Sequence, residues 1–190
     1  MMKRLMQGLL VAAALTIGPA TSAQQKIAAN IVFANLSGPD MAAIVQEDAA
    51  AIGPLFRRSS VASVGQVSVG QVLFLYLQFN EDGSIRGSHF TLREIIDLTQ
   101  APIVVIASEL KGDGWQKVAE AAKGKSNLIF TNNRNGPGFA KFFRRLFEMM
   151  RDGKEMLMAY VELAPQGPQQ DPSLPGTIMV AGRGRLAFAK

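Results

Sequence analysis

Short apolar runs alternate with amphipathic stretches along the chain, and this alternation predicts its secondary structure. The runs 72–79 (VLFLYLQF) and 103–107 (IVVIA) are apolar almost throughout, as parallel strands are when both faces of their sheet are covered. The runs 27–36 (IAANIVFANL) and 127–131 (NLIFT) predict two further strands. A cluster of Asn, Asp and Gly at residues 80–83 predicts a turn after the 72–79 strand.

Helices are predicted between these strands. The clearest covers residues 139–151, where Phe, Leu and Met side chains recur at helical spacing and the cations lie elsewhere. Thr91 and Glu94 have the form of a capping box, so a second helix is expected to begin at Leu92. The other predicted helices follow Pro39 as far as Gly53, cover residues 115–122 and cover residues 154–163.

The remaining segments complete a single α/β domain. Residues 59–71 contain alternating valines, which predict a strand or an edge ribbon. Residues 177–181 and 186–189 predict a final hairpin after a proline-rich loop. Strands that alternate with helices in this way are typical of a mostly parallel central sheet with helices on both faces. The length of the chain after residue 23 fits one such domain.

The first residues have the features of a secretory signal peptide. A short basic segment, Lys3-Arg4, precedes an apolar run over residues 5–17. Thr21 and Ala23 fill the two positions before a cleavage site at which signal peptidase requires small side chains. A membrane anchor is not expected, because the apolar run is shorter than the ~20 residues of a spanning helix. The sequence therefore predicts cleavage after Ala23 and a periplasmic or secreted protein.

Charge and composition exclude several classes of function. The chain has 20 Lys and Arg against 15 Asp and Glu, and loss of residues 1–23 lowers the net charge from +5 to +3. This balance argues against a dedicated nucleic-acid binder. The absence of cysteine excludes disulfides, thiolate catalysis and cysteine-based metal sites. His89 is the single histidine, so a two-histidine metal site is excluded too, and we expect no metal and no cofactor.

Polar residues follow the predicted strands. In a sheet of this kind, ligands bind in the crevice outside the carboxyl ends of the strands. The candidate binding residues at those ends are Gln78, Asn80, Ser108, Glu109, Asn132, Asn133 and Arg134.

From Val72 to the end of the chain, the order of features resembles a known family. A buried strand (VLFLYLQF) leads to a Gly-containing turn (NEDG), a short helix (TLREIIDLT) and a second buried strand (IVVIASEL). A long helix (FAKFFRRLFEMMRDG), a second helix (KEMLMAYVELA) and a proline-bearing segment (DPSLPGTIMVAG) come later. This order resembles the caspase-like hydrolases, especially their bacterial CHAT branch, and the resemblance implies a caspase-like fold.

The same resemblance implies that the family's activity is lost. The family places its catalytic histidine, followed by glycine, just after the first of these strands and its cysteine just after the second. Here the histidine position falls in Gln78-Phe79-Asn80 and the cysteine position falls at about Ser108.

Three hypotheses about function follow. The leading one is a catalytically inactive caspase-like domain that serves as a binding or interaction module, with a protein or small-molecule partner in the cell envelope. The alternative is a serine-dependent hydrolase with Ser108 as nucleophile and His89 as base, although no GxSxG elbow surrounds Ser108. The third is a small-molecule or anion binder that uses Arg134 and the Asn132-Asn133 loop.

Overall fold

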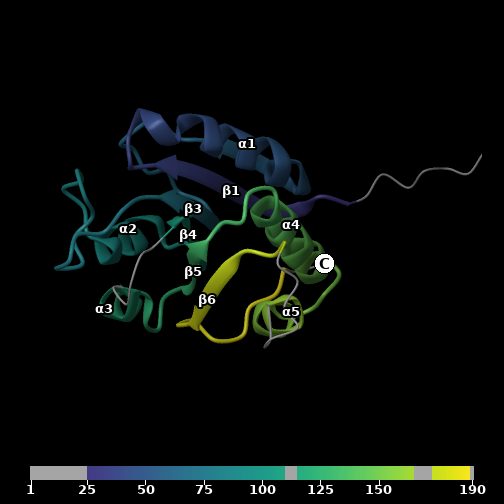
Figure 1. Cartoon of the computed structure of the whole chain (residues 1–190). Coiled ribbons are helices and arrows are strands. Elements are labelled where there is room, and N and C mark those ends of the chain that lie inside the picture. Colours follow the sequence, from purple (N-terminus) through teal and green to yellow (C-terminus); the bar gives the residue numbers. More distant parts are fainter. Residues whose placement is uncertain (1–24, 110–114, 165–172, 189–190) are drawn as a thin grey trace, which may run out of the picture.

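The computed structural model describes residues 25–109, 115–164 and 173–188 (Figure 1). Its strands are β1 (Ile27–Asn35), β2 (Phe56–Val61), β3 (Val72–Tyr76), β4 (Ile103–Glu109), β5 (Asn127–Asn133) and β6 (Gly176–Ala181). Its α-helices are α1 (Ala42–Ile52), α2 (Leu92–Thr99), α3 (Trp115–Ala119), α4 (Gly138–Arg151) and α5 (Met156–Leu163). Three short 3-10 turns are η1 (Pro39–Met41), η2 (Gly53–Leu55) and η3 (Glu120–Ala122).

The strands form one six-stranded sheet in the order β2-β1-β3-β4-β5-β6. Every neighbouring pair is parallel except β5 and β6, which are antiparallel. The predicted α/β fold with a mostly parallel central sheet is therefore confirmed. The order 2-1-3-4-5 is one of the two common doubly wound orders, and it reverses direction between β1 and β3.

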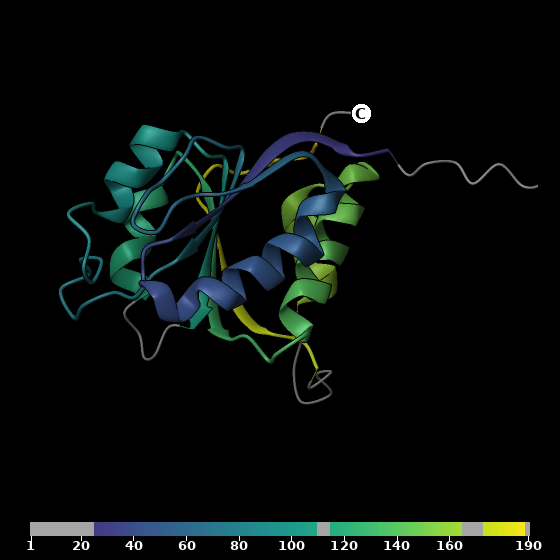
Figure 2. The same ribbon diagram turned by 90° about the horizontal axis from the view of Figure 1, so that it is seen from above.

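Helices cover both faces of the sheet. Figure 2 shows α1, α4 and α5 on one face and α2 and α3 on the other. On the first face, α4 inserts a row of phenylalanines against the sheet, and the ring of Phe143 lies 5.1 Å from that of Phe74 on β3. On the second face, Ile95 and Ile96 of α2 are buried against β3 and β4. Strands between two apolar layers must be apolar on both sides, which explains the continuous hydrophobic runs.

The capping box predicted at the start of α2 is present. The hydroxyl of Thr91 accepts the backbone N–H of Glu94 at 3.2 Å, and Oε2 of Glu94 accepts the backbone N–H of Thr91 at 2.8 Å. Each residue satisfies an N–H that has no partner inside the helix, so the sequence motif fixes where the helix begins.

Two predicted segments differ from the structure. The strand expected within 59–71 is instead β2, which ends at Val61, and residues 62–71 form a loop that runs back along the sheet. This loop is held by N–H groups of Ala62 and Gly65 that donate to carbonyl oxygens of β1 at 2.9 and 2.8 Å. β2 has no apolar run of its own because its side chains after Phe56 are exposed, and its strand conformation depends on pairing with β1.

The expected hairpin between 177–181 and 186–189 is the second difference. β6 pairs with β5 instead, and residues 183–188 contain no strand. Leu186 and Phe188 pack on the core that α4 forms, where the ring of Phe188 lies 5.9 Å from that of Phe56. Burial of these apolar side chains on the core takes the place of pairing with β6.

The predicted signal peptide, residues 1–23, lies outside the described residues. Within the ranges that the structure describes, no helix combines the length and the apolar character needed to cross a membrane.

Candidate functional site

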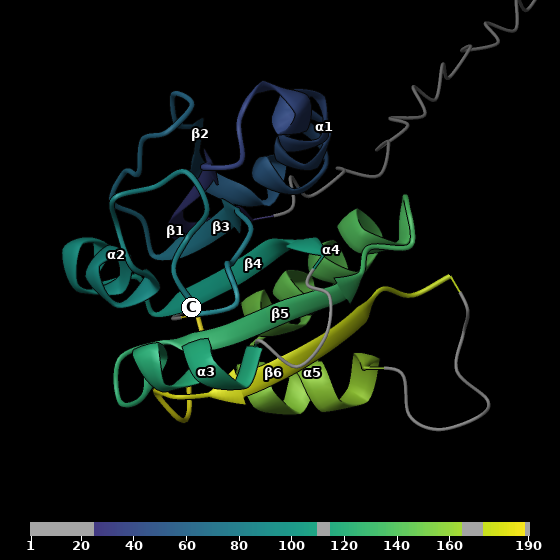
Figure 3. The same cartoon turned by 60° about the vertical axis from the view of Figure 1, so that its left-hand side comes forward.

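The polar residues identified in the sequence lie where parallel strands end. β3, β4 and β5 run side by side in the same direction, so the residues after them meet at one edge of the sheet (Figure 3). We call this the carboxyl edge. It is the place at which doubly wound proteins bind their ligands, so the arrangement of side chains there decides what chemistry is available.

A shielded ion pair joins α1 to the carboxyl edge. Nη2 of Arg134 donates to Oδ1 and Oδ2 of Asp48 at 2.9 and 2.7 Å. Asp48 is only 4% exposed, and the Arg134 side chain is only 14% exposed. Charges removed from water in this way are costly unless each is matched and hydrogen-bonded, so the two groups depend on each other.

The ion pair is completed by its neighbours. The hydroxyl of Tyr76 at the end of β3 donates to Oδ2 of Asp48 at 2.6 Å. Nη1 of Arg134 donates to the carbonyl oxygen of Ala107 in β4 at 2.6 Å. The guanidinium also lies over the ring of Phe139 in α4, with Cζ 3.8 Å from the ring centroid. We refer to Asp48, Tyr76 and Arg134 as the edge cluster.

The electrostatics of the edge cluster suit a structural role. Burial raises the pKa of the Asp48 carboxyl above its ordinary value, while the Tyr76 hydrogen bond and the Arg134 charge act in the opposite direction. Burial and the neighbouring Asp48 carboxylate also raise the pKa of the Tyr76 hydroxyl, which therefore remains a neutral donor. A general acid or base must exchange a proton with a substrate. In the edge cluster, the donors of Tyr76 and Arg134 are directed at the Asp48 carboxylate and not at a substrate position.

The loop after β1 begins where β1 and β3 stop pairing. The N–H of Leu36 donates to the carbonyl oxygen of Tyr76 at 2.8 Å, which completes the last paired position of the two strands, Asn35 with Tyr76. The amide of Asn35 then closes the loop after β1, because its Nδ2 donates to the carbonyl oxygen of Gly38 at 2.7 Å. Gly38 has φ of 104°, a conformation that glycine adopts without strain.

Ser108, the proposed nucleophile of the hydrolase alternative, is 5% exposed at the end of β4. Its Oγ donates to the carbonyl oxygen of Leu77 and accepts the N–H of Leu77, the latter at 2.8 Å. Both functions of the hydroxyl are therefore used within the backbone of the neighbouring chain segment. His89 lies exposed in the loop before α2. The geometry offers no support for an activated Ser108–His89 pair.

The other predicted binding residues do not converge on one ligand position. Gln78 and Asn80 are exposed in a turn that folds back on itself: Oε1 of Gln78 accepts from Arg86 at 3.0 Å, and Nδ2 of Asn80 donates to Ser84 at 2.8 Å. This turn includes the one predicted at residues 80–83, since the N–H of Gly83 donates to the carbonyl oxygen of Asn80 at 3.0 Å.

Glu109, Asn132 and Asn133 lie nearer to Arg134. Oε1 of Glu109 accepts the backbone N–H of Arg134 at 2.9 Å. Oδ1 of Asn133 accepts the N–H of Asn135 at 2.9 Å, and Asn132 is exposed at the end of β5. These contacts shape the loop that brings the Arg134 side chain to Asp48. They leave the guanidinium turned inward, away from the anion that the third hypothesis assigns to it.

Asp48 was not identified from the sequence, although a signal for it exists. The buried face of α1 contains Val45, Asp48 and Ile52, which recur at helical spacing. An acidic residue on an apolar helix face needs a buried partner of opposite charge or a hydrogen-bond donor. That partner lies 86 residues further along the chain, so sequence spacing does not reveal it.

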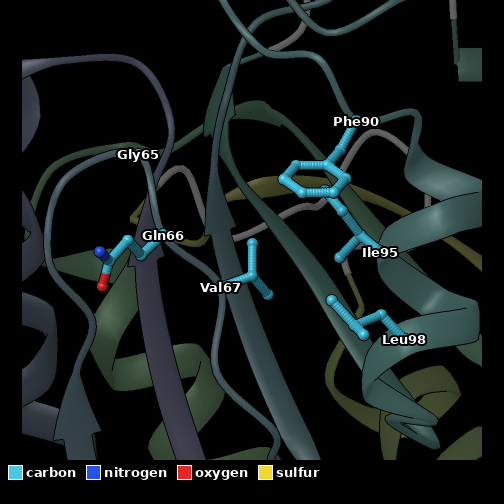
Figure 4. A pocket seen from close by; sticks show the side chains of 6 residues that line it. All are labelled: Gly65, Gln66, Val67, Phe90, Ile95 and Leu98. Atoms are coloured by element: carbon cyan, nitrogen blue, oxygen red, sulfur yellow. The ribbon is translucent and has the colours of Figure 1, made fainter.

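A shallow depression of about 240 Å³ lies between the 62–71 loop and α2 (Figure 4). Its lining is mainly apolar, and the side chains of Val67, Ile95 and Leu98 come from opposite sides of it. Sites for small ligands are generally larger, about 300–1,000 Å³, and contain a few convergent polar groups. The full lining is Gly65, Gln66, Val67, Phe90, Ile95 and Leu98. This depression does not have the polar groups of a catalytic site.

The described residues contain no metal centre, and known proteins offer no parallel. Within the described ranges, no group of three His, Asp or Glu side chains is placed to hold a metal ion. The chain matches no protein-family model, and no curated protein and no solved structure matches it. Any proposal about its function therefore depends on its own sequence and geometry.

Proposed function

We propose that this chain is an exported, catalytically inactive domain of caspase-like fold that acts as a binding or interaction module. The observation that carries the proposal is the state of the carboxyl edge, where a doubly wound fold presents its reactive groups. The shielded groups there, Asp48, Arg134 and Ser108, form hydrogen bonds with other groups of the protein. Internal contacts that occupy these three groups favour binding through another surface.

The order of elements supports the caspase-like part of the proposal. The features on which the resemblance rests appear as β3, α2, β4, α3, β5, α4, α5 and β6, in that order along the chain. The resemblance assigns the family's two catalytic positions to the turn after β3 and to the end of β4. They are occupied by Gln78-Phe79-Asn80 and by Ser108, which cannot supply a histidine base or a cysteine thiolate.

Labelling with a fluorophosphonate probe tests the absence of catalysis. The mature chain, residues 24–190, should not be labelled under conditions that label a serine hydrolase added to the same reaction. The physical reason is that the Ser108 hydroxyl donates to Leu77 and is buried, so it is not activated as a nucleophile. Labelling of the natural chain that disappears in Ser108→Ala would overturn the proposal and establish the hydrolase alternative.

Export is supported by the signal-like residues 1–23. The absence of cysteine is compatible with export, because a domain of this length can fold without disulfides. When the full chain is expressed in a bacterium with two membranes, the periplasmic form should begin at Gln24. Amino-terminal sequencing of that fraction measures this directly. Full-length protein retained in the cytoplasm, with Met1 still present, would contradict export.

A further inference from the structure

β2 forms an outer edge of the sheet. It pairs with β1 on one side and is the first strand in the sheet order, as Figure 3 shows. Phe56 at the start of the strand packs against Phe147 of α4, and the side chains after it are exposed. An edge strand presents unpaired N–H and C=O groups, which can pair with another chain.

The pairing with β1 shows which backbone groups of β2 point outward. The N–H of Ala62, just after the strand, donates to the carbonyl oxygen of Phe33 in β1. Backbone groups alternate in direction along a strand, and Val61 is the residue in register with Phe33. The N–H and C=O groups of Ser59 and Val61 therefore point away from β1, toward the open side of the sheet.

Two arginines flank this open edge. Arg57 and Arg58 are exposed, and within the described ranges neither forms an ion pair. They are the only charged residues between Asp48 and Glu81. Successive side chains of a strand point to opposite faces, so one arginine stands on each side of the edge. A strand added here would meet positive charge on both faces.

We propose that the β2 edge takes an extended, acidic segment of another protein as an additional strand of the sheet. Backbone hydrogen bonds to Ser59 and Val61 would provide the pairing, and Arg57 and Arg58 would select carboxylates on both faces of the added segment. A second copy of this chain is the less suitable occupant, because pairing β2 with β2 would gather four arginines at one edge. This inference rests on the proposed binding role and names the surface and the chemistry of the partner.

Binding of a designed peptide tests the inference. The probe is a fluorescein-labelled ten-residue peptide in which pairs of glutamates alternate with pairs of threonines, so that an extended peptide carries glutamates on both faces. It is added to residues 24–190 and followed by fluorescence anisotropy. Binding is expected, and the double variant Arg57→Glu/Arg58→Glu should weaken it by about tenfold or more. Ser59→Pro should weaken it similarly, because proline removes one outward N–H that β1 does not use. Thermal melting of each variant confirms that it is folded.

A charge-reversal variant of α4 and a proline-containing peptide distinguish strand addition at β2 from non-specific electrostatic attraction. Lys141→Glu/Arg145→Glu reverses two exposed cations on α4 and should leave the affinity unchanged. A peptide of the same charge with proline at every third position should bind at least about tenfold more weakly, because it cannot form a strand ladder.

Hydrogen exchange gives a residue-level readout. On peptide binding, exchange should slow at Ser59 and Val61 and remain unchanged at Ala62, whose N–H already pairs with β1. Absence of binding, equal binding of the proline peptide, equal loss in the α4 variant, or self-association through β2 would each overturn the inference. None of these outcomes depends on fluorophosphonate labelling, so failure here is distinguishable from failure of the inactive-domain proposal.

Discussion

Arg134 carries the same charged group as Arg57 and Arg58, which are adjacent to each other on β2. The surroundings of Arg134 are the opposite of theirs. Arg134 lies at the end of β5, where its guanidinium is held by Asp48, a backbone carbonyl and the ring of Phe139. Arg57 and Arg58 lie on an edge strand and are exposed to solvent. The first arginine stabilises the fold, whereas the other two are available to a partner. Position in the sheet, more than residue type, thus decides the role of each cation.

The largest expected effect comes from breaking the buried ion pair. Arg134→Ala leaves the Asp48 carboxyl without its counter-ion in a site shielded from water. Loss of one partner of a buried pair costs about 3–5 kcal/mol, so the free energy of unfolding should fall by that amount at neutral pH. Urea denaturation measures it.

An exposed pair provides the control for this variant. Lys123 and Glu120 form an ion pair at 3.4 Å with both side chains largely in water. Lys123→Ala should change the free energy of unfolding by about 1 kcal/mol or less. Equal effects of the two substitutions would contradict the structural role given to Arg134.

A smaller effect is expected in the pH dependence of stability. Burial raises the pKa of Asp48 in the folded state, and Arg134 opposes this rise, so Arg134→Ala should raise it further. A carboxyl whose folded pKa is raised contributes stability below its unfolded pKa and loses it as the pH rises through the folded pKa. The destabilisation by Arg134→Ala should therefore be smaller at acidic pH, where Asp48 is protonated in both states, and grow toward neutral pH.

Urea denaturation over a series of pH values checks this prediction. The double variant Asp48→Asn/Arg134→Ala lacks the titrating carboxyl, so its stability relative to the Asp48→Asn single variant should not vary with pH in the same way. A destabilisation by Arg134→Ala that shrinks as the pH rises would show that the sign is wrong.

Much of the fold could be predicted from the sequence because its signals are local. The buried strands are continuous apolar runs, and the start of α2 is marked by Thr91 and Glu94, which cap it. β2 could not be located, because its segment FRRSSV contains no apolar run and becomes a strand only through pairing with β1. The same absence of apolar residues hid the edge that we now propose as a binding surface.

The candidate site was predicted in part. The sequence placed Arg134 and Ser108 correctly at strand ends, since that follows from where the apolar runs stop. It did not show that Arg134 turns inward, because its partner Asp48 is on the first helix and is far away in the sequence. Tyr76 was counted only as part of an apolar strand, although its hydroxyl completes the cluster. Long-range pairing of this kind is a property of the tertiary structure.

The central claim is that Arg134 stabilises the fold, whereas Arg57 and Arg58 bind a partner. The most direct test measures the free energy of unfolding and the affinity for the glutamate–threonine peptide in the same preparations of Arg134→Ala and Arg57→Glu/Arg58→Glu. We predict that Arg134→Ala is strongly destabilised but binds the peptide normally at temperatures where it is folded. We predict that the free energy of unfolding of Arg57→Glu/Arg58→Glu stays within about 0.5 kcal/mol of that of the natural chain. The affinity of this variant for the peptide should fall by about tenfold or more. Loss of both properties in either variant, or loss of neither, would contradict the account.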